Sequence, residues 1–132
     1  IMSRDTVDIY NPKVIRSTAG SLFHLPILAM GTDDFFAWCD THELAVYAAD
    51  VYGTDSRQPE SLTDVIAAPE TFAGAKAVLF GNEARGLTKE VLERTDRIVS
   101  IPLYGKAESL NLGTSSAVML LSLAMSSHVE RM

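Results

Sequence analysis

Short apolar runs alternate with helix signals along this chain, and that alternation limits the fold more than any other feature. The runs predicted as strands lie at residues 22–27, 44–49, 75–80 and 98–101. Helices are predicted at residues 12–20, 32–40, 61–67 and 89–94, and from about residue 114 onward. Residues 52–60 are polar and contain Gly53 and Pro59, so they are predicted as a loop. This α/β pattern predicts a mostly parallel sheet that helices cover on both faces.

Composition narrows the class of protein. A chain of 132 residues with 47% apolar content is long enough for one domain with a sizeable core. The net charge of −6 and the lack of a basic run argue against strong nucleic-acid binding by this chain alone. Cys39 is the only cysteine, which excludes an internal disulfide and a cysteine-rich metal site. The sequence contains no run long enough for a membrane span and no signal peptide, so we expect the protein in a reducing, cytoplasmic environment.

Two loops depart from a routine α/β pattern. The first follows the predicted strand that ends at Phe80: Gly81 and Gly86 permit close backbone approach, and Thr88 offers an N-cap to the next helix. The second loop follows the strand that ends at Ile101, and it places Ser109 and Asn111 between apolar residues. Because ligands of open α/β sheets bind beyond the carboxyl ends of the strands, both loops are candidates for a binding site.

Together these loops resemble the second and third motifs of the SpoU family of RNA 2′-O-methyltransferases, in the wider SPOUT class. The matching residues are Phe80-Gly81-Asn82-Glu83-Ala84-Arg85-Gly86-Leu87 and Ile101-Pro102-Leu103-Tyr104-Gly105-Lys106-Ala107-Glu108-Ser109-Leu110-Asn111. Residues 7–21, with Asn11-Pro12-Lys13, also resemble the segment that follows the first motif of such proteins. The resemblance covers nearly the whole chain, and we treat residues 1–132 as one SpoU-type methyltransferase domain.

The resemblance implies an α/β fold whose C-terminal segment is threaded into a deep trefoil knot, the SPOUT or α/β knot. It also implies that the knot loops bind S-adenosylmethionine, largely through backbone groups. The expected cofactor-binding residues are Ala48, Ala49, Gly81, Asn82, Glu83, Gly86, Ile101, Leu103, Ser109, Leu110 and Asn111. The apolar members of this set suit the walls of a ligand pocket.

The implied reaction is methyl transfer to a ribose 2′-hydroxyl of RNA, with rRNA favoured over tRNA as the substrate. Glu83, Ser109 and Asn111 are the expected catalytic-site residues. As alternatives, Glu83 caps the helix that begins near Thr88, and Arg85 pairs with Glu83, contacts RNA phosphate or faces solvent. The family also implies a homodimer through the knot region. His24, His42 and His128 have no metal or triad spacing, so no metal site is expected.

The family's catalytic arginine lies in its first motif, before the Asn11-Pro12-Lys13 segment. We therefore expect that this chain lacks the first strand and helix of the domain and any N-terminal RNA-binding domain, and that it is inactive alone. A non-catalytic module that binds S-adenosylmethionine or dimerises is the first alternative. The second is an unrelated α/β enzyme that holds a nucleotide phosphate at residues 81–86, although this loop lacks the usual phosphate-binding glycine patterns.

Overall fold

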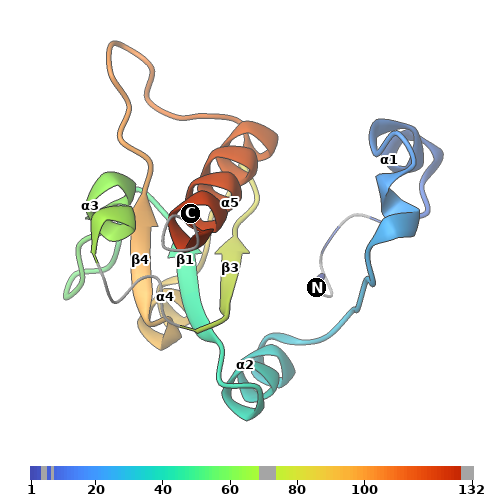
Figure 1. The fold of residues 1–132 in the computed structure, drawn as a ribbon, viewed down its shortest axis with the longest axis horizontal. Coiled ribbons are helices and arrows are strands. Elements are labelled where there is room, and N and C mark those ends of the chain that lie inside the picture. The colour runs from blue at the N-terminus through green and yellow to red at the C-terminus, as the bar shows by residue number, and fades with distance from the viewer. Residues whose placement is uncertain (4–5, 7, 69–73, 129–132) are drawn as a thin grey trace. The chain divides into compact units, whose positions relative to one another are not determined.

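The computed structural model describes residues 1–3, 6, 8–68 and 74–128, so Val7 of the family-like opening segment lies outside the described residues. The chain divides into two compact units, Ile1–His42 and Glu43–Met132 (Figure 1). The sheet belongs to the second unit. The trefoil knot and the single domain over residues 1–132 stay predictions.

The first unit is built from short helical segments. α1 (Pro12–Ser17) begins as predicted, because the Asn11 side chain accepts a hydrogen bond from the Lys13 N–H at 3.0 Å. A 3-10 helix, η1 (Ser21–His24), follows, and then α2 (Thr32–Thr41). An isolated parallel bridge joins Met2 to Ala29.

The predicted strand at residues 22–27 is wrong. η1 begins there instead, after Gly20 turns the chain at a φ of +88°. The side chains of Phe23 and Leu25 are 80% and 69% exposed, and Pro26 has no N–H to donate to a neighbouring strand. The run is apolar, but among the described residues no strand pairs with it.

The second unit contains a four-stranded sheet in the order β2-β4-β1-β3, and every pairing is parallel. The strands are β1 (Ala45–Ala49), β2 (Glu60–Ser61), β3 (Lys76–Phe80) and β4 (Arg97–Ser100). β1 pairs with β3 over its full length and with β4 from Tyr47 onward. The parallel sheet is therefore confirmed, while β2 was missed because residues 52–60 were predicted as a loop and Ser61 as a helix start.

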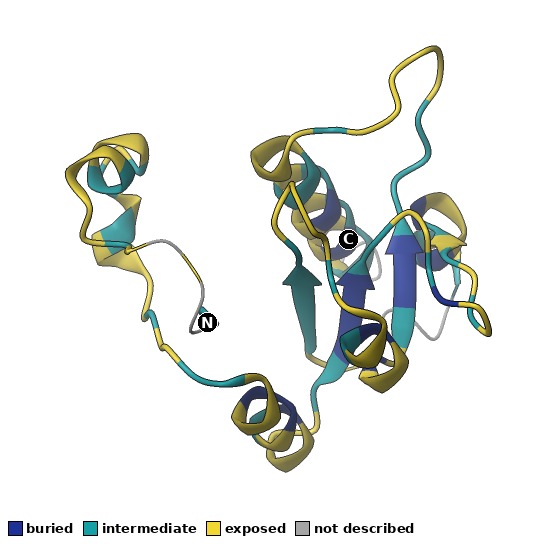
Figure 2. Cartoon of the chain, turned by 180° about the vertical axis from the view of Figure 1, so that it is seen from behind, coloured by how far each residue is buried: buried dark blue, intermediate teal, exposed yellow. Residues whose placement is uncertain are grey.

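Helices cover both faces of this sheet, as predicted. α3 (Leu62–Ala67) and α5 (Leu112–His128) pack on the face that carries Tyr47 and Val99. α4 (Lys89–Arg94) packs Leu92 on the opposite face, which carries Ala48 and Ile98. Successive strand residues point to opposite faces, so Tyr47 and Ala48 belong to different clusters. Figure 2 shows the two central strands, β4 and β1, as more deeply buried than β3.

The carboxyl ends of β1, β3 and β4 meet at one edge of the sheet because the strands are parallel. Three segments leave from this edge: residues 50–59, 81–88 and 101–111. Figure 1 shows the last of them, in orange, running out beyond the sheet before it returns to α5. These segments include both loops that the sequence analysis singled out.

Candidate cofactor site

A cavity of about 500 Å³ lies at the carboxyl ends of β1, β3 and β4. Its lining comes from residues that are distant in the sequence but leave the sheet at the same edge. They are residues 49–53, 80–87, 89, 92, 99–101, 103, 109, 110, 112, 115 and 119. The volume falls within the range of about 300–1,000 Å³ that is usual for small-molecule sites.

The loop after β3 is closed on itself. The Gly86 N–H donates to the Asn82 carbonyl at 2.9 Å, and the Arg85 N–H donates to the Asn82 Oδ1 at 2.7 Å. A Cβ atom on Gly81 would lie 2.4 Å from the Gly86 carbonyl carbon, so no side chain fits at residue 81. Gly86 has a φ of +63°, which few other residues adopt. The local fold therefore requires glycine at both positions.

Glu83 connects this loop to the start of α5. Its Oε1 accepts a hydrogen bond from the Leu112 N–H at 3.3 Å. α4 has a cap of its own, because the Thr88 hydroxyl accepts from the Val91 N–H at 3.3 Å. The carboxylate of Glu83 thus lies at the N-terminus of α5, where a negative charge is favourable.

Asn111 caps α5. Its Oδ1 accepts from the Thr114 N–H at 2.8 Å, and its carbonyl accepts from the Ser115 N–H at 2.9 Å. Ser109 lies two residues earlier and lines the cavity. The segment between β4 and α5 therefore contributes one lining hydroxyl and one helix cap.

The apolar wall of the cavity is formed by Ile101, Leu103 and Leu110, all half-buried. Ala49 lines the cavity at the end of β1. Ala48 is fully buried and packs with Leu92 and Ile98 under α4.

The structure brings most of the predicted site residues into one cavity. Those in the lining are Ala49, Gly81, Asn82, Glu83, Gly86, Ile101, Leu103, Ser109 and Leu110. Ala48 and Asn111 do not line it: one points into the core, and the other caps the neighbouring helix.

Sequence reasoning missed Asp50, Tyr52, Lys89 and Ser115, which also line the cavity. Asp50 directly follows β1, and its Oδ2 accepts hydrogen bonds from the N–H groups of Tyr52 at 2.9 Å and Gly53 at 2.7 Å. The sequence signal for Asp50 is a charged residue directly after the apolar run at residues 44–49, outside both SpoU-like motifs.

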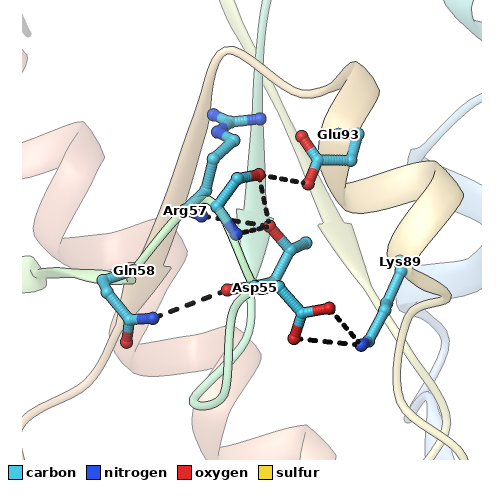
Figure 3. A network of polar contacts seen from close by, with 7 residues as sticks. Asp55, Arg57, Gln58, Lys89 and Glu93 are labelled. Carbon is cyan, nitrogen blue, oxygen red and sulfur yellow. Dashed lines mark hydrogen bonds and ion pairs between the residues drawn. The ribbon is translucent and has the colours of Figure 1, made fainter.

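Polar contacts fix the loop at residues 50–59, which follows β1, against α4 (Figure 3). The Arg57 guanidinium donates to the carbonyls of Leu92 and Thr95 at 2.8 Å each and of Asp96 at 3.2 Å. Hydrogen bonds from the hydroxyls of Thr54 and Ser56 lower the pKa of Glu93 below its ordinary value, with the nearby Arg57 charge acting in the same direction. The loop is thereby held to the C-terminal end of α4.

The pattern of loops and strands has a counterpart among known proteins. The model of the SpoU rRNA Methylase family matches residues 1–121. The chain belongs to this family. The predicted family is therefore confirmed.

Two relatives of this chain are methyltransferases of 23S ribosomal RNA. The 23S rRNA (guanosine(2553)-2′-O)-methyltransferase RlmP of Bacillus subtilis is 33% identical over 120 residues, which are 91% of this chain and 44% of that protein. The 23S rRNA (uridine(2479)-2′-O)-methyltransferase of Streptomyces viridochromogenes is 31% identical over 121 residues, which are 91% of this chain and 40% of that protein. The chain thus spans less than half the length of these relatives.

A solved SpoU-like structure has the same fold. The S-adenosylmethionine-bound rRNA methyltransferase of Sinorhizobium meliloti superposes with a TM-score of 0.79 at 28% identity, covering 93% of this chain and 44% of that chain.

Within the described part of this SpoU chain, no three His, Cys, Asp or Glu side chains gather where they could hold a metal ion. Across the same residues, no helix combines the length and the apolarity needed to cross a membrane.

Proposed function

We propose that the protein carrying residues 1–132 is a ribose 2′-O-methyltransferase of RNA that takes its methyl group from S-adenosylmethionine. The main support for this proposal is that both SpoU-like loops line the same cavity, at the carboxyl ends of β1, β3 and β4. We also propose that residues 1–132 form one SpoU-type domain.

The cavity suits the cofactor in size and in the chemistry of its lining. Ile101, Leu103 and Leu110 offer apolar walls to an adenine ring, while Gly81 and Gly86 leave backbone groups accessible at the opposite loop. When bound, the cofactor supplies a methyl group on a sulfonium whose departure leaves a neutral thioether. The protein then has to orient the acceptor hydroxyl and provide for removal of the proton that this hydroxyl loses on methylation.

Glu83 and Ser109 are the polar side chains that we assign to the reacting end of the cavity. Both line it, and Glu83 is exposed enough to meet an RNA ribose. Asn111 acts as a positioning residue, because it fixes the start of α5 beside the Glu83 carboxylate. Arg85 and Lys89, which also line the cavity, are the cations available to an RNA phosphate.

We propose ribosomal RNA as the substrate, since both relatives described above act on 23S rRNA. We further propose a homodimer in which α5 contributes to the interface. Leu120, Leu121 and Met125 on this helix are 50%, 62% and 66% exposed. Exposed apolar side chains in such a row are typical of protein interfaces.

The decisive experiment has two steps, carried out on the longest natural form of the protein that contains residues 1–132. Calorimetric titration of S-adenosylmethionine tests cofactor binding. Transfer of labelled methyl to ribosomal and transfer RNA, followed by nuclease digestion to 2′-O-methyl nucleosides, tests the reaction. Binding without transfer to either RNA would support the non-catalytic module instead, and absence of binding would reject the proposed cofactor.

A further inference from the structure

Asp50 supplies a carboxylate to the cavity from the end of β1. It follows β1, which lies between β4 and β3 in the sheet, and its half-buried side chain lines the cavity. Oδ2 of this carboxylate accepts the N–H groups of Tyr52 and Gly53 at 2.9 and 2.7 Å. Two hydrogen bonds on one oxygen fix the orientation of the whole group.

The second carboxylate oxygen, Oδ1, lies beside Gly86 of the loop after β3. A Cβ built on Gly86 would have this oxygen as its one neighbour within 4 Å, at an ordinary van der Waals distance of 3.9 Å. Both N–H groups of the turn bind Oδ2, so Oδ1 is the oxygen of Asp50 that remains to accept a hydrogen bond from a ligand in the cavity.

We propose that Asp50 accepts a hydrogen bond from the ribose hydroxyls of the bound nucleoside cofactor. The inference rests on the proposed cofactor site. The apolar wall of Ile101, Leu103 and Leu110 comes from the β4 side, and Glu83 comes from the β3 side. The ribose is the middle part of the cofactor, between adenine and amino acid, and Asp50 stands between these two sides. An acidic side chain binds a ribose hydroxyl in the same way in dinucleotide-binding α/β folds.

The variant Asp50→Asn tests this assignment with little change in shape. The amide oxygen takes over the N–H groups of Tyr52 and Gly53, which places the NH2 group where Oδ1 was. The turn is kept, but an acceptor becomes a donor. Asp64→Asn is the matched control, because Asp64 is an exposed residue of α3 outside the cavity lining.

The experiment is calorimetric titration with S-adenosylhomocysteine and with its 2′,3′-dideoxy analogue. In the wild-type protein, loss of the hydroxyls should weaken binding by about 10- to 100-fold, as expected for a hydrogen bond to a charged group. Asp50→Asn should bind S-adenosylhomocysteine more weakly than the wild type and should show a smaller loss with the dideoxy analogue, because an amide NH2 can only donate to a hydroxyl oxygen. Asp64→Asn should behave as the wild type does.

Three results would overturn the assignment. Wild-type affinity of Asp50→Asn for S-adenosylhomocysteine, or an unchanged penalty for the dideoxy analogue in that variant, would show that Asp50 does not serve the ribose. If the wild-type protein binds none of these ligands, the proposed function fails and the Asp50 assignment fails with it.

Discussion

Gly81 is the residue whose identity the fold restricts most tightly. A Cβ at this position would meet the backbone of Gly86 and Leu87 at 2.4–2.7 Å, and a backbone cannot move aside as a flexible side chain can. The sequence motif predicted a close approach at Gly81. The structure shows that Gly81 approaches the backbone of Gly86 and Leu87 in its own loop. This loop forms one wall of the cavity.

Gly81→Ala should therefore open the loop and abolish measurable binding of S-adenosylhomocysteine. Overpacking of this kind costs about 1–3 kcal/mol of stability. Gly113→Ala is the control, since its Cβ would meet Asn111 Oδ1 at an ordinary 3.5 Å within α5. Calorimetry and thermal unfolding check both variants, and tight binding by Gly81→Ala would contradict the role of the closed loop.

Asn111→Ala removes the N-cap of α5, and it should lower the free energy of unfolding by about 1 kcal/mol. It should also weaken binding of S-adenosylmethionine, because the start of α5 carries the Leu112 N–H that Glu83 accepts. Thr88→Ala is the matched control: it removes the cap of α4 at a similar cost but leaves α5 intact. Urea unfolding together with calorimetry separates the two effects. Equal binding by both variants would argue against a positioning role.

At the scale of elements, the loop between β1 and β2 depends on one side chain. Arg57 joins it to three carbonyls at the end of α4, and the same loop supplies Asp50, Tyr52 and Gly53 to the cavity. The exposed ion pair of Lys89 with Asp55, at 3.2 Å, contributes far less because solvent screens it.

Arg57→Met should lower the free energy of unfolding by about 1.5–3 kcal/mol, because two part-buried charged hydrogen bonds, to the carbonyls of Leu92 and Thr95, are lost together with an exposed one to Asp96. Lys89→Met should change it by less than about 1 kcal/mol. Chemical denaturation of both variants tests the difference. A larger effect from Lys89→Met would show that the network is held mainly by the exposed pair.

Glu93 gives this network a pH dependence. Because the folded-state pKa of Glu93 is lowered, its contribution to stability is present above the unfolded-state pKa and is lost as pH falls through the folded-state pKa. Glu93→Gln should therefore be less stable than the wild type at neutral pH and should approach it in acid. Unfolding curves from pH 7 down to about pH 3 follow the difference. A constant difference over that range would exclude the linkage.

The sequence predicted elements well where several signals agreed, and poorly where one signal stood alone. The α4 helix was correct to the residue, because Thr88, the apolar spacing and the following strand all pointed to it. Residues 22–27 had an apolar run and no other strand signal, and the first three of them belong to η1. The two residues of β2 carry no signal of their own, since only pairing with β4 makes them a strand. At the site, family motifs located both loops. Asp50 lies outside them, and its sequence signal, a charged residue directly after an apolar run, does not show that it lies between the strands that carry the two loops.

At the scale of the whole molecule, the exposed apolar face of α5 is the feature that most needs a partner. Leu121, at 62% exposed, lies in the middle of it. Leu121→Glu should convert a dimer into monomers with little loss of helix stability, because a charged side chain is costly in an apolar interface. Sedimentation velocity at micromolar concentration measures the outcome. A wild-type protein that is already monomeric would reject the dimer.

The strand order also fixes a sequence of events during synthesis. β1 and β3 are neighbours and can pair as soon as residue 80 has been made. β2 lies at the far edge, where β4 separates it from β1, so its hydrogen-bonding partner does not exist until residues 97–100 have been translated. β4 completes the sheet and leads into the second motif loop, so the cavity cannot be complete until the residues after β4 have been made. A ribosome-bound chain that stops before β4 is therefore a chain without a binding site, however much of its sequence has emerged.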